Sequence, residues 1–266
     1  VAEIEERMEK QRSAQIIIID SLQYTGLTYA DYKRLRDRFR HKLFIFVSHA
    51  SGREPKGEVG KSVKYDAFVV TDEVYEHMVY APNVHTCMAS LPGMYEHTIT
   101  CNSLSKTYSI TGWRLGYLIG PEWVIENAKK VHDFLTVGAA SPLQEAATVG
   151  LKFPESYYDE VLALYTEKRQ YFLDGLDRIG VKHNVPQGTY FVMIDISDFL
   201  ALPQFKGYTD LEFCEWMIIN IGVAAVPGSS FFREEVNHLI RLHFAREKST
   251  LDEALSRLAK LQELLK

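Results

Sequence analysis

Three short motifs carry side chains that could together bind and activate a small organic molecule. The first is DEVY at 72–75, the second is SLSK at 103–106, and the third is GWRLGY at 112–117. Lys106 supplies an amine, which as a free base attacks carbonyl carbon. Arg114 stands eight residues further on, and a guanidinium fork combined with serine hydroxyls suits a phosphate group.

One cofactor needs all of these groups at once. Pyridoxal 5'-phosphate (PLP) requires an amine to hold its aldehyde as an imine, a carboxylate against its pyridine nitrogen, donors for its phosphate and a hydrogen bond to its phenolic oxygen. We therefore assign the amine to Lys106, the carboxylate to Asp72 and the phenolic hydrogen bond to Tyr75. The phosphate donors in this interpretation are Ser103, Ser105 and Arg114.

In this order and spacing, the motifs resemble the fold-type-I, class I/II aminotransferases over about residues 66–266. The resemblance implies that Lys106 is both the imine lysine and the proton shuttle, that Asp72 partners the pyridinium, and that Tyr75 binds the phenolic oxygen. It also implies phosphate ligands at three further positions, with the last a more occasional contact: Ser103, Arg114 and Ser105.

A later segment, LIRLHFA at 239–245, resembles the family strand whose arginine grips the substrate α-carboxylate, which makes Arg241 the substrate anchor. The activity implied is transamination between an L-amino acid and a 2-oxo acid through a Lys106 imine. Another fold-type-I activity, such as a β-eliminating lyase, shares the lysine and the aspartate and stays open as an alternative. A P-loop ATPase relative and an inactive hybrid fragment also stay open.

The elements that must position these residues follow an α/β pattern. Five apolar runs, QIIIID, KLFIFVSH, AFVVTDEVY, TITCNSLSK and LGYLIG, predict strands of an open sheet, which binds ligands just past the carboxyl ends of its strands. Residues 121–150 and 154–179 are predicted to be long helices. The strands TYFVMIDI, VAAVPG and LIRLHFA alternate with the helix DLEFCEWMIIN and a final helix from about Ser249.

This pattern predicts an α/β fold with an incomplete three-layer, PLP-transferase-like large domain and a smaller α+β C-terminal domain. We expect three parts: an atypical N-terminal α/β segment at 1–65, the PLP-binding part at 66–165 and the small domain at 166–266.

The first 65 residues depart from the family pattern. The Asn-Pro loop that should precede the DEVY strand is replaced by SHASGREPKGEVGKS, so the asparagine that binds the phenolic oxygen cannot be assigned. Residues 15–66 weakly resemble the later part of a RecA-like P-loop ATPase core, with Asp20 as the Walker B carboxylate and Ser48 or His49 as a nucleotide sensor. We therefore hypothesise a hybrid chain.

The ATPase interpretation lacks its phosphate loop. GEVGKS ends in the required Gly-Lys-Ser, but Pro55 stands where GxxxxGK[ST] needs its first glycine. The expected junction of the hybrid lies near residues 65–68.

Bulk properties exclude several classes of function. The net charge of −5 gives no electrostatic case for nucleic-acid or anionic-membrane binding, and without a run of 18 apolar residues no transmembrane helix is expected. Three cysteines without CxxC spacing argue against disulfides or a zinc site and fit a cytoplasmic location, and the histidines show no metal spacing. The resemblance adds the expectation of a homodimer.

Overall fold

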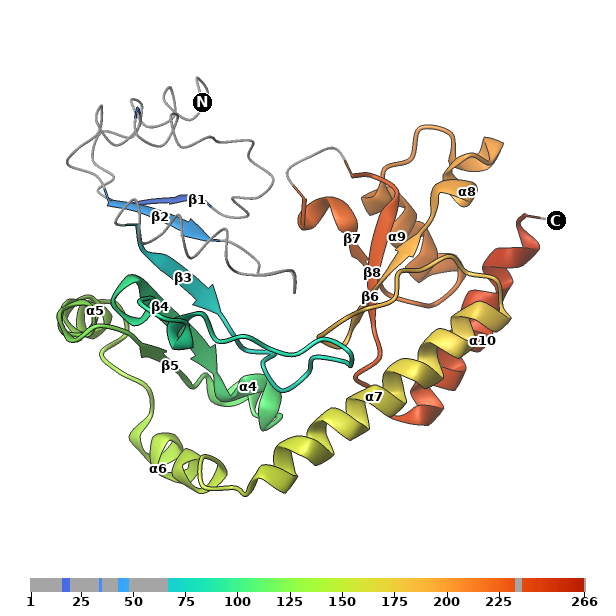
Figure 1. The fold of residues 1–266 in the computed structure, drawn as a ribbon. Coiled ribbons are helices and arrows are strands. Elements are labelled where there is room, and N and C mark those ends of the chain that lie inside the picture. The colour runs from blue at the N-terminus through green and yellow to red at the C-terminus, as the bar shows by residue number, and fades with distance from the viewer. Residues whose placement is uncertain (1–15, 20–33, 35–42, 48–66, 233–235, 266) are drawn as a thin grey trace. The chain divides into compact units, whose positions relative to one another are not determined.

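The computed structural model describes residues 16–19, 34, 43–47, 67–232 and 236–265 (Figure 1). The chain divides into two compact units. Unit 1 comprises Val1–Val74 and His85–Phe153, and unit 2 comprises Tyr75–Val84 and Pro154–Lys266. The two units are described separately below. The predicted division at 1–65, 66–165 and 166–266 stays a prediction.

Unit 1 is built on a five-stranded sheet in the order β1-β2-β3-β4-β5, blue to green in Figure 1. Its strands are β1 (Ile16–Ile19), β2 (Leu43–Val47), β3 (Val69–Asp72), β4 (Thr98–Ser103) and β5 (Gly116–Ile119). The first four pair in parallel, and β5 runs antiparallel to β4. All five predicted strands are confirmed, except that the last part of TITCNSLSK is helical.

Short helices and turns connect these strands and lead away from them. They are η2 (Met88–Ser90), η3 (Tyr95–His97), α4 (Leu104–Thr107), η4 (Thr111–Trp113), α5 (Glu122–Thr136) and α6 (Ser141–Gly150). The prediction of one helix over 121–150 is wrong. Val137 and Gly138 adopt positive φ angles of 63° and 159°, and Pro142 lies in the first turn of the next helix, so the chain bends and begins α6 anew.

Part of the apolar surface of unit 1 is exposed. All four residues of β5 are exposed, with Leu118 and Ile119 each at 47%. No residue of α5 is buried, and Phe134 near its end is 91% exposed. Among the described strands, β5 is the last of its sheet, so its outer edge has no strand partner there.

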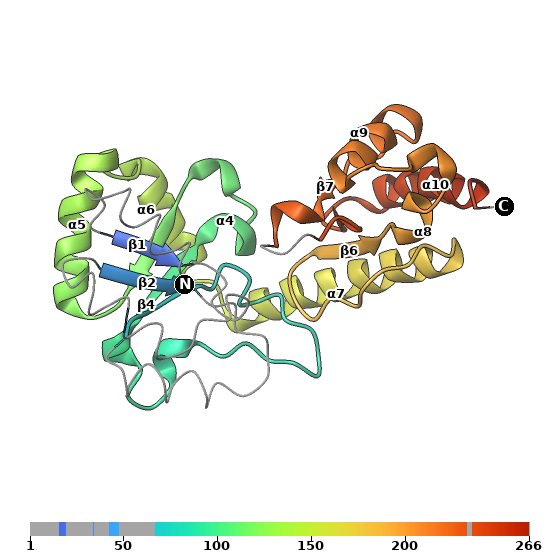
Figure 2. The same cartoon turned by 90° about the horizontal axis from the view of Figure 1, so that it is seen from above.

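Unit 2 combines a three-stranded sheet with helices, as Figure 2 shows. The sheet has the order β6-β8-β7 and is antiparallel, with β6 (Phe191–Asp195), β7 (Val226–Pro227) and β8 (Leu239–His243). The helices are α7 (Glu155–Arg178), α8 (Ser197–Leu200), η5 (Pro203–Phe205), α9 (Asp210–Asn220), η6 (Gly228–Ser230) and α10 (Lys248–Glu263). The predicted α+β character of this part of the chain is confirmed.

The core of unit 2 forms between one face of this sheet and the helices. Alternate strand residues such as Val192 and Ile240 point into it, because successive side chains of a strand face opposite sides. Helix α7 packs tightly on α10: a Cβ added at Gly175 would lie 2.3 Å from Leu255 Cδ1. The core side chains contributed by helices include Phe172, Leu176, Phe213, Met217, Leu251, Leu255 and Leu258.

Residues 75–84 join this unit by backbone hydrogen bonds. Tyr80 N donates to Gln187 O (2.9 Å) and Thr189 N to Met78 O (2.8 Å). The Tyr80 ring is buried, and its hydroxyl donates to Thr189 O at 2.5 Å. No described helix is both long and apolar enough to cross a membrane.

Candidate active site

The carboxyl edge of the unit 1 sheet gathers several of the predicted site residues. Strand β3 ends at Asp72, whose register partner is Cys101 on β4, and Ser103 at the end of β4 pairs with Gly116 at the start of β5. Because β5 is antiparallel, its start lies at the same edge as the ends of β3 and β4. The parallel sheet therefore places these motifs side by side, as the sequence predicts.

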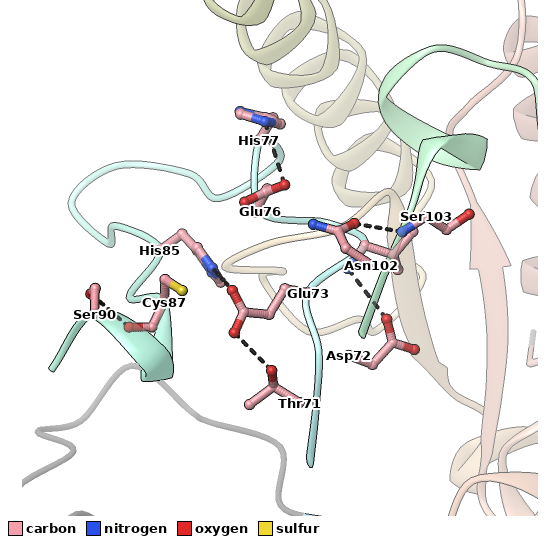
Figure 3. A network of polar contacts seen from close by, with 11 residues as sticks. Thr71, Asp72, Glu73, Glu76, His77, His85, Cys87, Ser90, Asn102 and Ser103 are labelled. Atoms are coloured by element: carbon pink, nitrogen blue, oxygen red, sulfur yellow. Dashed lines mark hydrogen bonds and ion pairs between the residues drawn. The ribbon is translucent and has the colours of Figure 1, made fainter. Parts of the chain in front are cut away.

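Asp72 has an exposed carboxylate. Its Oδ1 accepts from Val74 N at 3.3 Å, which turns the carboxylate back toward the chain that leaves the strand (Figure 3). The neighbouring Cys101 is half-buried, and its thiol pKa is raised by burial and by the negative charges of Asp72 and Glu73. The thiol thus stays protonated beside a carboxylate that can accept a further hydrogen bond.

Ser103 and Ser105 form a compact group of donors at the start of α4. Ser103 caps the helix by accepting from Ser105 N (3.1 Å), and its Oγ lies 2.6 Å from Ser105 Oγ. The Ser103 hydroxyl also donates to Leu115 O at 3.0 Å, across to the turn that carries Arg114. Lys106 follows within this helix and is half-buried.

Arg114 occupies a left-handed conformation, with φ 57° and ψ 41°, that ends η4. Its Nη1 donates to Thr111 O at 3.0 Å, and Thr111 Oγ1 donates to Ser105 O at 3.1 Å. These bonds tie the arginine turn to the serine pair. A non-glycine residue in this conformation is uncommon, and here it sets the direction in which the chain enters β5.

The donor set fits the cofactor that the sequence predicts. A carboxylate, two hydroxyls 2.6 Å apart, a guanidinium and a lysine amine occur along one sheet edge. Hydroxyls with a guanidinium suit a phosphate ester, whereas a carboxylate suits a protonated ring nitrogen. The residues present on unit 1 therefore match what PLP requires.

Tyr75 and Arg241 lie on unit 2, among aromatic rings. The Tyr75 ring packs edge-on against Tyr190 (5.3 Å between centroids) and Phe191 (6.0 Å). Arg241 Cζ lies over the rings of Phe191 (3.9 Å) and Phe231 (4.0 Å). Burial lowers the pKa of the Arg241 guanidinium, while Tyr75 and Tyr190 act in the opposite direction.

A network around Glu73 escaped the sequence-based prediction. Glu73 is buried, and its carboxylate accepts from Thr71 Oγ1 (2.8 Å) and lies 2.9 Å from His85 Nε2 (Figure 3). Burial raises the carboxyl pKa, but the hydrogen bonds from His85, Thr71 and Cys87 together leave it below its ordinary value. No spacing rule links residues 73 and 85, so the sequence held no signal for this pair.

Two other features were also missed. Asn102 Oδ1 accepts from Ser103 N at 2.7 Å and so helps to orient the serine (Figure 3); the polar run at the end of β4 is its only sequence signal. Phe231 beside Arg241 lies in the sequence VPGSSFF, whose residue spacing does not predict this contact. Four positions named for the ATPase interpretation lie outside the described residues: Asp20, Ser48, His49 and Pro55.

Known proteins show which family this chain resembles. The family model Aminotransferase class I and II matches residues 58–258. Kynurenine–oxoglutarate transaminase 3 from Bos taurus is 36% identical over 207 residues, which are 72% of this chain and 46% of that protein. Methionine aminotransferase from Escherichia coli is 34% identical over 198 residues, or 74% of this chain and 50% of that one.

Solved structures show the same likeness in three dimensions. The aromatic aminotransferase from Pyrococcus horikoshii OT3 superposes with a TM-score of 0.74 and 26% identity, covering 94% of this chain and 74% of that chain. The α/β fold predicted from the sequence is confirmed. The chain spans about half the length of the curated relatives it matches. From the extent of the family match and these identities, the chain belongs to the class I and II aminotransferases.

Proposed function

We propose that the protein containing this chain is a PLP-dependent aminotransferase that moves an amino group between an L-amino acid and a 2-oxo acid. The observation that carries the proposal is the convergence of Asp72, the Ser103–Ser105 pair and the Arg114 turn at one sheet edge, in a chain of this family. The relatives are named as kynurenine–oxoglutarate, aspartate and methionine aminotransferases.

When bound, PLP supplies an aldehyde that condenses with amines and a ring that takes up the electron pair left at the substrate α-carbon. Lys106 would provide the amine that holds this aldehyde. Once free, the Lys106 amine would act as the base that takes the proton from the substrate α-carbon. The Asp72 carboxylate would face the pyridine nitrogen and favour its protonated form.

The remaining residues orient the reactants. Ser103 and Ser105 hydroxyls, together with the Arg114 fork, hold the phosphate, for which charge-assisted bidentate contacts are suited. The Tyr75 hydroxyl donates to the phenolic oxygen. Arg241 binds the α-carboxylate of the amino acid or 2-oxo acid. This contact sets the orientation of the bond between the α-carbon and its hydrogen.

A first experiment tests the lysine. The protein is mixed with PLP, its visible absorbance is recorded, the adduct is reduced with borohydride, and the label is mapped by peptide mass spectrometry. We expect the label on Lys106, and no visible band in Lys106→Ala. Labelling spread over exposed lysines such as Lys129 and Lys182, or an unchanged band in the variant, would reject the assignment.

A second experiment separates transamination from the lyase alternative. An aminotransferase makes 2-oxo acid from an amino acid over many turnovers only when an acceptor 2-oxo acid is supplied in excess. A β-eliminating lyase releases ammonia without any acceptor. Release of ammonia at the same rate with and without the acceptor would contradict the proposal and favour the lyase.

We also propose how the protein assembles, where it is located and how the chain originated. The protein is a cytoplasmic homodimer that acts on small molecules and has no nucleic-acid or membrane partner; the three described cysteines are free, which suits a reducing compartment. We also propose that the chain is a hybrid, joined near residues 65–68 to a segment that resembles a P-loop ATPase, because the two sequence resemblances are both partial and meet there. A native transcript that encodes a complete aminotransferase N-terminal half would end the hybrid hypothesis.

A further inference from the structure

The small sheet of unit 2 has one face buried in the core and an opposite face that carries Arg241. Strands β6 and β8 pair Met193 with Arg241 and Phe191 with His243. Paired residues of an antiparallel ladder point to the same side, and the intervening Val192 and Ile240 are buried in the core. Arg241 and Phe191 therefore share the sheet face that is turned away from the core.

On this face the Arg241 guanidinium is covered by aromatic rings. Its Cζ lies 3.9 Å from the centre of the Phe191 ring and 4.0 Å from that of Phe231. A guanidinium is planar and its five N–H donors lie in that plane. Two rings this close to Cζ restrict the rotation of the guanidinium, and rings stacked on its faces would leave the donor edge available.

That donor edge has no protein acceptor among the described residues. Arg241 contacts the two rings there and interacts at longer range with Tyr75 and Tyr190. A partly buried cation without a carboxylate partner costs desolvation energy. The two rings offset part of this cost by cation–π attraction and, unlike a carboxylate of the described residues, would not occupy the N–H groups.

The segment that carries Phe231 is itself held from two sides. A Cβ added at Gly228 would lie 2.5 Å from Leu239 O, so this segment lies directly against β8. Ser229 donates to the buried Asp210 carboxylate through its N (2.7 Å to Oδ2) and its Oγ (3.0 Å to Oδ1). Phe231 N then donates to Gly228 O at 2.8 Å. The Phe231 ring is therefore placed by a fixed turn.

We propose that Phe191 and Phe231 are positioning residues that hold the Arg241 guanidinium by its two faces, so that its in-plane N–H pair is preset for a planar carboxylate. The inference rests on the proposed function for the role of Arg241 as the α-carboxylate anchor. It adds that affinity for the carboxylate depends on the rings, which themselves make no hydrogen bond to the substrate.

The first test needs neither cofactor nor turnover. In arginine-labelled protein, the Arg241 Nε–H signal, assigned with Arg241→Lys, is expected upfield of other arginines because aromatic rings shield protons above their faces. Phe191→Leu and Phe231→Leu should each move it toward the common position, and Phe231→Tyr should not. Tyr208→Leu is the matched control, because Tyr208 is 37% exposed and Phe231 42%.

The second test measures binding and kinetics. With 3-phenylpropionate as the probe, followed by the same signal, each leucine variant should weaken binding about three- to tenfold, and Phe231→Tyr should restore it. In the PLP-loaded protein the leucine variants should raise KM for the amino acid with little change in kcat. Wild-type affinity and an unmoved Arg241 signal in both leucine variants would overturn the inference, even if Lys106 takes the borohydride label. A failed Lys106 label with weakened probe binding would instead reject only the proposed function.

Discussion

A single methyl group at Gly116 should loosen the predicted phosphate-binding edge. A Cβ there would lie 2.8 Å from Asn102 O and 3.7 Å from Ser103 Cα, whereas ordinary contacts begin at 3.4 Å. Both neighbours are backbone atoms and cannot rotate away, so β5 must shift from β4 by about 0.6 Å at this pair. Overpacking of this kind costs about 1–3 kcal/mol.

Two hydrogen bonds lie directly in the path of this shift. Ser103 Oγ donates to Leu115 O at 3.0 Å and Leu104 N to the same oxygen at 3.2 Å. Each contributes about 0.5–1.5 kcal/mol net, so that the two together contribute about 1–3 kcal/mol, which is the same range as the overpacking cost. Gly116→Ala should therefore destabilise the β4–β5 pair by about 1–3 kcal/mol, and weaken PLP binding by separating Ser103 from Arg114.

Hydrogen exchange measures this locally. Amides of β4 and β5 should open about 5- to 150-fold more often in Gly116→Ala, at the usual tenfold per 1.4 kcal/mol. Gly112→Ala is the matched control, because a Cβ at Gly112 meets no atom within 4 Å; it should stay within about 0.5 kcal/mol of wild type. Equal protection of β4 and β5 in the two variants would refute the reasoning.

Three further predictions concern pH, thiol chemistry and a helix cap. Because the pKa of Glu73 is lower in the folded protein than its ordinary value of 4.5, the ionised carboxylate stabilises the fold above pH 4.5, and this stabilisation is lost as the pH falls through the folded-state pKa. The difference in unfolding free energy between wild type and Glu73→Gln, measured by urea titration, should therefore shrink below pH 4.5. A difference that stays constant with pH would argue against the His85–Glu73 pairing. Burial raises the pKa of the Cys214 thiol to about 11. At pH 8 iodoacetamide should therefore alkylate this thiol about a hundredfold more slowly in the folded than in the unfolded protein. Equal alkylation rates by mass spectrometry would contradict the burial of Cys214. Thr209→Ala removes the capping box of α9 and should lower the free energy of unfolding, measured by calorimetry, by about 1 kcal/mol. Ser249→Ala, at the exposed start of α10, is the control and should lower this free energy much less.

The sequence predicted the strands well because apolar runs and the period of two are local properties. The helix break at Val137 could not be predicted, because it depends on a backbone conformation that valine rarely adopts, and the apolar pattern continues across it. Helix α9, by contrast, carries its own start signal, and Thr209 with Glu212 forms the capping box that the pattern T-x-x-E indicates.

The candidate site likewise contains residues that the sequence marks and contacts that it does not. Asp72, Ser103 and Arg114 could be proposed from the sequence because each lies in a short motif, and the pairing of β3, β4 and β5 brings these motifs to one edge of the sheet. The Glu73–His85 pair and the rings around Arg241 arise from contacts between segments separated in sequence. Such contacts depend on tertiary packing, which no local pattern records.

The exposed strand β5 leads to a prediction about the behaviour of this polypeptide at high concentration. No described strand lies beyond its outer edge, and the strand exposes the apolar side chains of Leu118 and Ile119. Edges of this kind recruit strands from other molecules. A dilution series by light scattering should therefore show reversible self-association, and Leu118→Lys, which places a charge on the edge, should suppress it without touching the serine pair or Lys106.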